Sequence, residues 1–258
     1  MRRLIYAVGD CLVLAGRGAR HLVRRLDTLI TAVILPIVIL LLFVYLFGGA
    51  IQVALGSQAD YTDYVLPGVL LSSIGYVATT TSSSVNDDMK KGFVARLCSM
   101  PVARPAFIVG HAFASLIRSM AAVAAVTGLA VVIGYRSSAS LADWLIVVGL
   151  LLAFALAMTA VAIVLGLVAS GPDAASALGM PLMFLSYFSG ALVPIDTMPP
   201  ALQAFCTYQP VNAVWEAVSG LTLGGGGYSI GAAFAWCVGI AAAGILASSV
   251  LFARKAAE

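Results

Sequence analysis

Few residues of this 258-residue chain could carry out chemistry, and their placement argues against catalysis. A serine nucleophile needs a histidine base within hydrogen-bonding reach. The candidates are Ser186 or Ser189 with His111, but His111 falls at one end of an apolar stretch and both serines fall inside another. We therefore do not expect an intramembrane serine protease.

An ion-coupled secondary transporter would need ionisable groups deep in the membrane, where a charge is costly. Arg118 is the one candidate, and it is predicted about three turns into an apolar stretch. We expect its side chain either to reach the near interface or to pair with Asp173. An ion relay through Arg118 is kept as an alternative.

Phosphate-binding and metal-binding patterns are absent from the sequence. The glycine run 224–227 lacks the lysine of a usual phosphate-binding loop. The cysteines Cys11, Cys98, Cys206 and Cys237 have no C-x-x-C spacing and are interpreted as packing residues. We expect no ATP hydrolysis and no cofactor in this chain, and no nucleic-acid binding, because no basic stripe is interleaved with aromatic residues.

The elements that position these residues are predicted to be membrane spans. Hydrophobic residues make up 62% of the chain and charged residues 10%, against about 25% charged in a soluble domain. We predict an all-α polytopic membrane protein with a single domain over residues 1–258 and six transmembrane helices. The predicted spans are 28–50, 64–85, 107–134, 144–169, 175–193 and 229–252.

Positive charges lie almost wholly on one side of these spans. Twelve Lys and Arg residues fall in the N-terminal segment, the loop after span two and the C-terminus. The loops after spans one, three and five hold Arg136 alone. The positive-inside rule therefore places both termini in the cytoplasm. No cleavable signal peptide is expected, because the first apolar run is too long for one.

Three segments outside the spans have distinct patterns. Residues 1–27 combine apolar residues and arginines at helical spacing, which predicts an amphipathic interfacial helix or, alternatively, a simple topogenic tail. Residues 86–106 are the most polar internal segment. Residues 194–227 are too polar to span and too apolar for an exposed loop, which predicts two short helices, 201–205 and 211–221, dipping into the outer leaflet.

Two patterns inside the spans bear on helix packing. The hydroxyl run 79–84 either packs helices together or lines a wet path. Small residues recur every four positions in span six and predict packing within the subunit. They are Gly231, Ala235, Gly239, Ala243 and Ala247.

Two segments on opposite sides of the predicted membrane carry a family resemblance. Residues 86–110, NDDMKKGFVARLCSMPVARPAFIVG, resemble the cytoplasmic loop of ABC type-2 exporter permeases. Residues 189–221, SGALVPIDTMPPALQAFCTYQPVNAVWEAVSGL, resemble their extracellular re-entrant segment, closest to the daunorubicin-resistance type of drug and lipid exporters. The chain departs from that pattern in having Lys91 and Phe93 beside Gly92, where many relatives carry Glu and Thr, and in lacking an arginine near Ser219.

The resemblance implies a permease subunit of an ABC exporter in a bacterial plasma membrane. Its substrate would be hydrophobic or amphiphilic, such as a drug, an antibiotic or a lipid, moved outward by ATP-driven alternating access. A polysaccharide or cell-envelope polymer exporter of the same superfamily is the alternative. The implied partners are a separate ATPase subunit in two copies, carrying ATP and Mg, a second permease subunit, identical or paralogous, and membrane lipids.

The resemblance also implies roles for individual residues. Residues 86–106 would hold a cytoplasmic coupling helix between spans two and three that docks on the ATPase, through Asp87, Asp88, Lys90, Lys91, Gly92 and Arg96. Spans two and five would line the substrate path, with the outer gate at Phe184, Tyr187, Phe188 and Leu192. Phe184, Phe188 and Leu192 are predicted to share one helical face. The extracellular re-entrant helices between spans five and six would depend on Pro194, Asp196, Pro199, Pro210 and Glu216.

Overall fold

The computed structural model of the chain describes residues 26–48, 61–91, 105–137, 139–191, 195, 198–224 and 227–255, and every regular element among them is helical. The predicted interfacial helix at 1–27 lies outside this part, except for the two residues that begin α2. The elements are α2 (Leu26–Leu41), the π-helical η1 (Leu42–Phe47), α4 (Tyr61–Lys90), α6 (Pro105–Ile133), α7 (Leu141–Val168), α8 (Pro172–Phe184), α9 (Pro200–Tyr208), α10 (Pro210–Leu223) and α11 (Ile230–Lys255).

Four of the predicted spans are confirmed as helices long and apolar enough to cross a bilayer. Among the described residues these are α4, residues 106–133 of α6, α7 and α11. The bounds of these helices differ from those of the predicted spans by one to five residues at each end. The chain is therefore a multi-pass, all-helical membrane protein over the part that the structure describes.

The first and fifth predicted spans are shorter as helices than expected. In the first, the apolar helical stretch is Ile30–Leu46, and regular α-helix gives way to η1 one and a half turns after Pro36. In the fifth, α8 has 13 residues and ends at Phe184, so it is too short to cross a bilayer core of about 30 Å. The prediction of a continuous helix over 175–193 is wrong.

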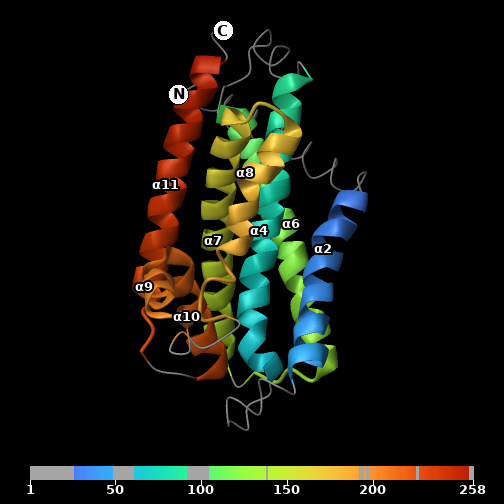
Figure 1. Cartoon of the computed structure of the whole chain (residues 1–258), viewed down its shortest axis with the longest axis vertical. Helices are drawn as coiled ribbons and strands as arrows, with labels where there is room; N and C mark the ends of the chain where they lie inside the picture. The colour runs from blue at the N-terminus through green and yellow to red at the C-terminus, as the bar shows by residue number, and fades with distance from the viewer. Residues whose placement is uncertain are drawn as a thin grey trace.

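The helices form one bundle around α4, which lies between α8 on one side and α2 and α6 on the other (Figure 1). In the most apolar stretch of α4, 83% of the residues are buried inside the chain, against 22% in α11. Helix α11 is therefore peripheral and packs mainly on α7. Because α4 is central, few of its side chains reach the surface. Those few side chains indicate what kind of surface the bundle presents to its surroundings.

Glycines let neighbouring helices approach α4 closely. A Cβ atom on Gly75 of α4 would lie 2.6 Å from the Leu182 carbonyl oxygen of α8. A Cβ atom on Gly166 of α7 would lie 2.4 Å from the Ser82 carbonyl oxygen of α4. Backbones this close maximise van der Waals contact, which replaces the hydrophobic effect as the main packing force within a bilayer.

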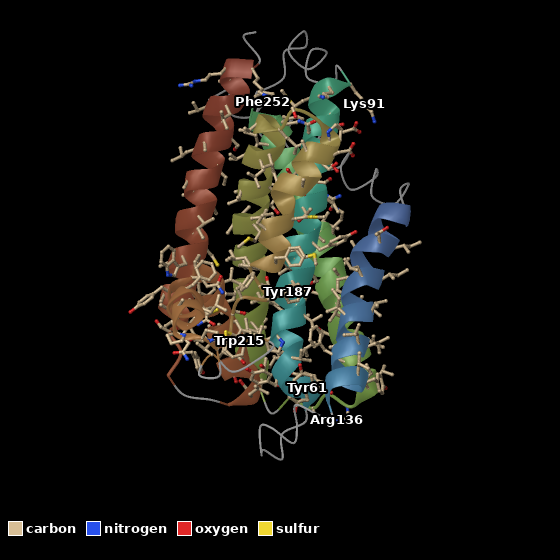
Figure 2. All side chains as sticks on the ribbon, in the orientation of Figure 1. Tyr61, Lys91, Arg136, Tyr187, Trp215 and Phe252 are labelled. Atoms are coloured by element: carbon tan, nitrogen blue, oxygen red, sulfur yellow. The ribbon has the colours of Figure 1, made fainter. Side chains whose placement is uncertain are left out.

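The bundle has two chemically different ends. Lys91, at the end of α4, lies at the same end as Phe252 of α11, whereas Tyr61 and Arg136 lie at the opposite end (Figure 2). The first end is fastened by stacking of Phe252 on Phe107 of α6, with ring centroids 5.0 Å apart. Because α4 ends and α6 begins here, the segment between them starts and finishes at this end.

The short helices α9 and α10 lie near the opposite end (Figure 1), where α10 packs against α7, α11 and α4, and α9 packs against α10. Pro200 and Pro210 begin them, as expected for a residue whose missing N–H is not needed in a first turn. Gly224 ends α10 in a left-handed conformation at φ 77°. The sequence thus predicted both helices, each beginning one residue late and ending two to three residues early.

The small-residue stripe of α11 faces the wrong way for the role predicted from its spacing. Gly231, Ala235, Gly239, Ala243 and Ala247 are all exposed in the described structure. The face that packs consists instead of Ala233, Cys237, Ala241, Gly244 and Ser248. Both sets repeat at helical spacing, so the spacing of small residues alone could not choose between them.

Candidate functional site

The open face of α4 is polar along the half of the helix that leads to Lys91. From residue 71 to residue 88, the positions that are not buried follow one helical stripe and the final turn. Every residue of the stripe carries a hydroxyl or a charge, and none is fully exposed. We call Tyr76, Thr80, Ser83, Ser84 and Asp87 the polar face of α4.

The hydroxyl run 79–84 divides between the two alternatives left open by the sequence. Thr79, Thr81 and Ser82 are buried, and the Thr79 hydroxyl donates to the Gly179 carbonyl of α8 at 2.8 Å. Thr80 and Ser84 are half-buried and donate to carbonyls of their own helix. One side of the run therefore packs helices, while the other side presents hydroxyl groups on the open face.

Beyond Asp173 in its first turn, the open face of α8 is apolar and lies beside the polar face of α4. Gly75 and Thr79 of α4 contact α8, so the next positions around the helix, Tyr76 and Thr80, lie along its border. On α8 the exposed side chains include Met180 and Phe184, which is 48% exposed. The two helices together present an amphiphilic surface.

The aromatic residues predicted to gate the path do not share one helical face, because α8 ends at Phe184. Tyr187 and Phe188 follow in a turn over residues 185–191, which we call the mid-bundle turn. Tyr187 lies near mid-height of the bundle, with its ring centroid 6.1 Å from that of Phe184. Phe188 is 45% exposed and its ring makes an edge contact with Phe205 of α9. Leu192 lies outside the described residues.

The mid-bundle turn breaks the helix near mid-height of the bundle (Figure 2), and side chains hydrogen-bond part of its backbone. The Tyr64 hydroxyl donates to the Gly190 carbonyl at 2.5 Å, and Asn212 Oδ1 accepts from the Gly190 amide at 3.1 Å. The Gln209 amide donates to the Phe188 carbonyl. Non-helical backbone at this depth is tolerated only where protein or water satisfies it. These contacts, from Tyr64 of α4, Asn212 of α10 and Gln209 just before α10, explain why the chain can turn here.

The described residues of the predicted re-entrant segment support this turn from α9 and α10. Pro199 precedes α9 and Pro210 begins α10. Glu216 is exposed, and its carboxylate accepts a hydrogen bond of 2.8 Å from the Asn212 amide. Pro194 and Asp196 lie outside the described residues. Sequence reasoning assigned no structural role to Asn212 or to Gln209, although Gln209 belongs to the segment that carries the family resemblance.

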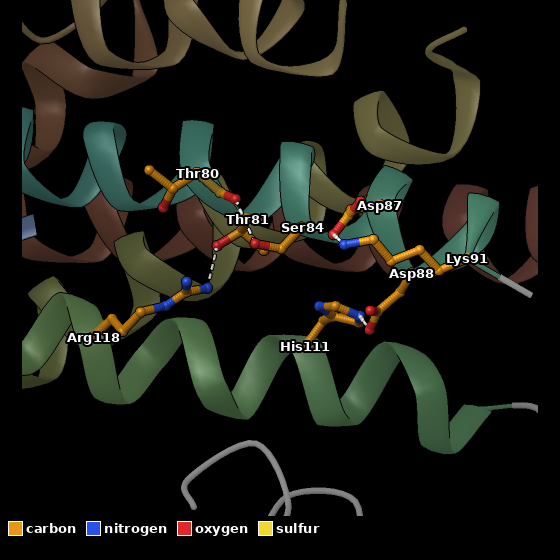
Figure 3. Close-up of polar contacts among 8 residues, drawn as sticks. All are labelled: Thr80, Thr81, Ser84, Asp87, Asp88, Lys91, His111 and Arg118. Atoms are coloured by element: carbon orange, nitrogen blue, oxygen red, sulfur yellow. Dashed lines mark hydrogen bonds and ion pairs between the residues drawn. The ribbon is translucent and has the colours of Figure 1, made fainter. Parts of the chain in front are cut away.

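The charged end of the bundle holds the predicted coupling residues that the structure describes. Lys91 Nζ lies 2.5 Å from Asp87 Oδ2, and His111 Nε2 of α6 lies 3.3 Å from Asp88 Oδ2 (Figure 3). Lys90 is exposed, and the Lys91 side chain is 63% exposed. Gly92 and Arg96 lie outside the described residues. We call Asp87, Asp88, Lys90, Lys91 and His111 the charged end.

Arg118 takes neither of the two positions expected from the sequence. It is buried within the bundle, and its Nη2 donates to Thr81 Oγ1 at 3.0 Å, whereas Asp173 is exposed. Burying a charged side chain in a bilayer costs about 2.5–3.5 kcal/mol on insertion scales. A hydrogen bond between membrane helices returns on average about 0.6 kcal/mol. Arg118 is thus a net cost to stability.

The other residues that could carry out chemistry lie far from one another or already have packing partners. His111 lies at the charged end beside Asp88, while Ser186 and Ser189 are buried in the mid-bundle turn. Within the described ranges, no three His, Cys, Asp or Glu side chains gather as a metal site would need. Cys206 of α9 packs against Met198, with sulfur atoms 3.7 Å apart, and burial raises the pKa of its thiol. No arrangement for nucleophilic or metal catalysis is present among these residues.

Comparison with known proteins gives a consistent set of relatives. The model of a family described as ABC-2 type transporter matches residues 10–223. A daunorubicin resistance ABC transporter permease protein of Streptomyces coeruleorubidus is 29% identical over 213 residues, which cover 82% of this chain and 72% of that protein. A probable doxorubicin resistance ABC transporter permease protein of Mycobacterium tuberculosis is 23% identical over 218 residues, covering 84% of this chain and 78% of that protein.

Proposed function

We propose, from the premise that the chain belongs to the ABC-2 type transporter family, that it is the membrane-embedded permease subunit of an ABC exporter. Its substrate would be a hydrophobic or amphiphilic compound, such as a drug, an antibiotic or a lipid. Relatives named for resistance to daunorubicin and doxorubicin favour this substrate class over a polysaccharide or an ion-coupled solute. The direction of transport would be out of the cell.

The observation that carries the proposal is the polar face of α4 beside the exposed aromatic residues of α8 and the mid-bundle turn. A polar stripe gains nothing from facing lipid, so a second subunit or a wet path is the better neighbour for it. An amphiphilic compound needs both kinds of surface: hydroxyl groups for its polar part and Phe184, Tyr187 and Phe188 for its rings or chains.

Energy for uphill transport would come from a separate ATPase subunit in two copies, which would hold ATP and Mg. The charged end of α4 and α6 is the proposed docking region, because it has exposed lysines beside half-buried aspartates, and so charges of both signs. Such charges orient partners and select among them more than they add affinity. The segment 92–104, which joins the two helices, would be the main contact surface.

The outer end of the path would be closed by the mid-bundle turn and the helices α9 and α10. In this arrangement the chain crosses the membrane six times, with α8 and the following turn together forming the fifth crossing. The charged end would face the cytoplasm together with both termini, in agreement with the distribution of Lys and Arg. A second permease subunit, identical or paralogous, would complete the path opposite α4 and α8.

The proposal is tested by co-expressing the chain with candidate ATPase subunits and reconstituting the purified complex in lipid vesicles. We expect ATPase activity that amphiphilic compounds change, and ATP-dependent accumulation of a fluorescent anthracycline in inside-out vesicles. The chain alone and a complex with an inactive ATPase are the controls. Formation of no complex with any ATPase subunit, or accumulation driven by an ion gradient without ATP, would count against the proposal.

A further inference from the structure

The proposed function does not explain why Arg118 and the hydroxyl groups around it are buried together in the bundle. Arg118 reaches from α6 to Thr81 on α4, as Figure 3 shows. Thr81 Oγ1 lies 3.0 Å from Ser115 Oγ of α6, which lies 2.8 Å from Thr159 Oγ1 of α7. A continuous chain of polar contacts thus joins three helices inside the bundle. We call Thr81, Ser115, Arg118 and Thr159 the hydroxyl–guanidinium cluster.

This cluster is not explained by stability. The Arg118 side chain is 7% exposed, its Nε has no hydrogen-bond partner, and the ion pairs found among the described residues do not include it. A buried charge with incomplete partners is less stable than an apolar side chain of similar volume. A guanidinium that costs stability and yet is held in one geometry suggests a role in how the helices move.

The cluster lies between the two helices that flank the proposed coupling segment. Helix α4 ends at Lys90 and α6 begins at Pro105, so both feed directly into residues 92–104. Near the opening of this hairpin, Asp88 contacts His111 at 3.3 Å. Deeper in the bundle, Thr81 of α4 is hydrogen-bonded to both Arg118 and Ser115 of α6. The hairpin is thereby fastened at two depths.

Asn86 adds a link from the same part of α4 to α7. Its side-chain amide donates to the Gly166 carbonyl at 3.0 Å and to the Ala169 carbonyl at 2.7 Å. The inner half of α4 is therefore hydrogen-bonded to α6 and α7 on its buried side, while its opposite side carries the polar face. A displacement of the coupling segment can therefore be transmitted through α4 to the proposed substrate path.

We infer that Arg118 is a positioning residue that, through Thr81, makes α4 and α6 move as one unit when the ATPase displaces the coupling segment. This inference rests on the proposed function. Arg118 does not contact the path itself, because its partner Thr81 lies on the buried side of α4. Its effect is on the transfer of motion, so it governs how much transport each hydrolysed ATP produces.

The hydrogen-bonding capacity of Thr81 explains why the Arg118 guanidinium can tie α4 to α6. The Thr81 hydroxyl has one hydrogen and two acceptors in reach, the Val77 carbonyl at 2.8 Å and Ser115 Oγ at 3.0 Å. A hydroxyl that bonds back to its own helix no longer ties that helix to a neighbour. By donating to Thr81, the guanidinium keeps a tie to α6 whichever way the hydroxyl hydrogen points.

The test measures substrate transported per ATP hydrolysed in the reconstituted complex, with Thr81→Val and Arg118→Gln as single and double variants. Thr81→Val keeps the shape of the side chain and removes the hydroxyl. We expect each single variant to assemble with the ATPase and to hydrolyse ATP at the wild-type rate without substrate. Transport per ATP should fall by about threefold, the factor to which one interhelical hydrogen bond corresponds. The double variant should lose no more than Thr81→Val alone, because Thr81→Val already removes the tie to Arg118.

Thr127→Val is the matched control, since Thr127 is a half-buried threonine of the same helix α6 beyond the cluster. It should leave transport per ATP unchanged. Transport and ATPase activity that fall in proportion in Thr81→Val and Arg118→Gln would overturn the inference and leave the cluster a purely structural role. Unchanged transport per ATP in Thr81→Val would overturn it as well. Failure of the wild-type complex to transport would instead contradict the proposed function, before any variant is compared.

Discussion

The charged end and the mid-bundle turn handle polar groups in opposite ways. At the charged end the polar groups are charged side chains that pair with one another and stay partly exposed, as in Lys91 with Asp87. In the mid-bundle turn they are backbone groups, buried and satisfied by fixed side chains, as in Gly190 with Asn212. The first arrangement leaves charges free to exchange partners, whereas the second fixes one geometry. The comparison indicates that partner binding belongs to the charged end and precise shape to the turn.

The largest effect on stability is expected in the mid-bundle turn. Asn212→Leu removes the acceptor of the buried Gly190 amide, and an unsatisfied buried amide costs about 1–3 kcal/mol. We expect a clearly lower thermal unfolding midpoint of the purified subunit in detergent. Glu216→Gln is the matched control, because it keeps an oxygen acceptor for Asn212 on an exposed position. Equal unfolding midpoints for Asn212→Leu and wild type would show that the mid-bundle turn does not depend on a fixed side-chain contact.

The largest effect on function without loss of stability is expected at the charged end. Reversing both charges with Lys90→Glu and Lys91→Glu should lower ATP-driven transport by about tenfold through misoriented docking of the ATPase. The unfolding midpoint should stay close to the wild-type value, because both side chains are exposed. Arg254→Glu, an exposed cation at the same end of the bundle on α11, is the control. Full transport by the double variant would remove the coupling role from these lysines.

A smaller and more selective effect is expected for the aromatic contact between the turn and α9. Phe188→Ala removes an edge contact with Phe205, which is worth about 0.5–1.5 kcal/mol in aromatic pairs. If Phe188 also gates the path, the relative transport of several amphiphilic compounds should change, or leak should rise. Phe205→Ala is the control, since it removes the same contact from the α9 side. An identical substrate profile for Phe188→Ala and wild type would return Phe188 to packing alone.

The smallest effect is expected for the pair at the opening of the α4–α6 hairpin. Asp88→Asn weakens the contact between a half-exposed carboxylate and the largely buried His111 ring, and pairs near the protein surface contribute about 0.2–1 kcal/mol. The unfolding midpoint should therefore change by no more than a few degrees, with transport nearly intact. A loss of stability comparable to that of Asn212→Leu would show that the charged end is as fixed as the turn.

The sequence predicted the spans whose signal comes from length and hydropathy, and it failed where a tertiary contact decides. Helix α7 is uniformly apolar, so its prediction needed no knowledge of neighbours. Helix α8 ends at Phe184 because Asn212, Gln209 and Tyr64 satisfy the turn that follows. Those partners lie more than 20 residues away or on another helix, so no local pattern in 175–193 could reveal the break.

Single residues of the candidate path could not be assigned from the sequence either, because their burial depends on tertiary packing. The hydroxyl run 79–84 was visible in the sequence, but its division depended on where α6, α7 and α8 pack. Thr80 and Thr81 are chemically identical neighbours, yet one lies on the open face and the other is buried beside Arg118. The small-residue stripe of α11 faces outward for a similar reason, since Ala and Gly occur on both its faces.

The most direct test of the account is the accessibility of two adjacent positions on α4. Thr80→Cys and Thr79→Cys would be made in a chain whose Cys11, Cys98, Cys206 and Cys237 are replaced by serine or alanine. The account predicts that a water-soluble thiol reagent modifies Thr80→Cys in the assembled complex, that a transported amphiphile protects it, and that Thr79→Cys stays unmodified. Equal reactivity at both positions, or modification of Thr80→Cys by lipid-soluble reagents alone, would contradict a substrate path along the polar face of α4.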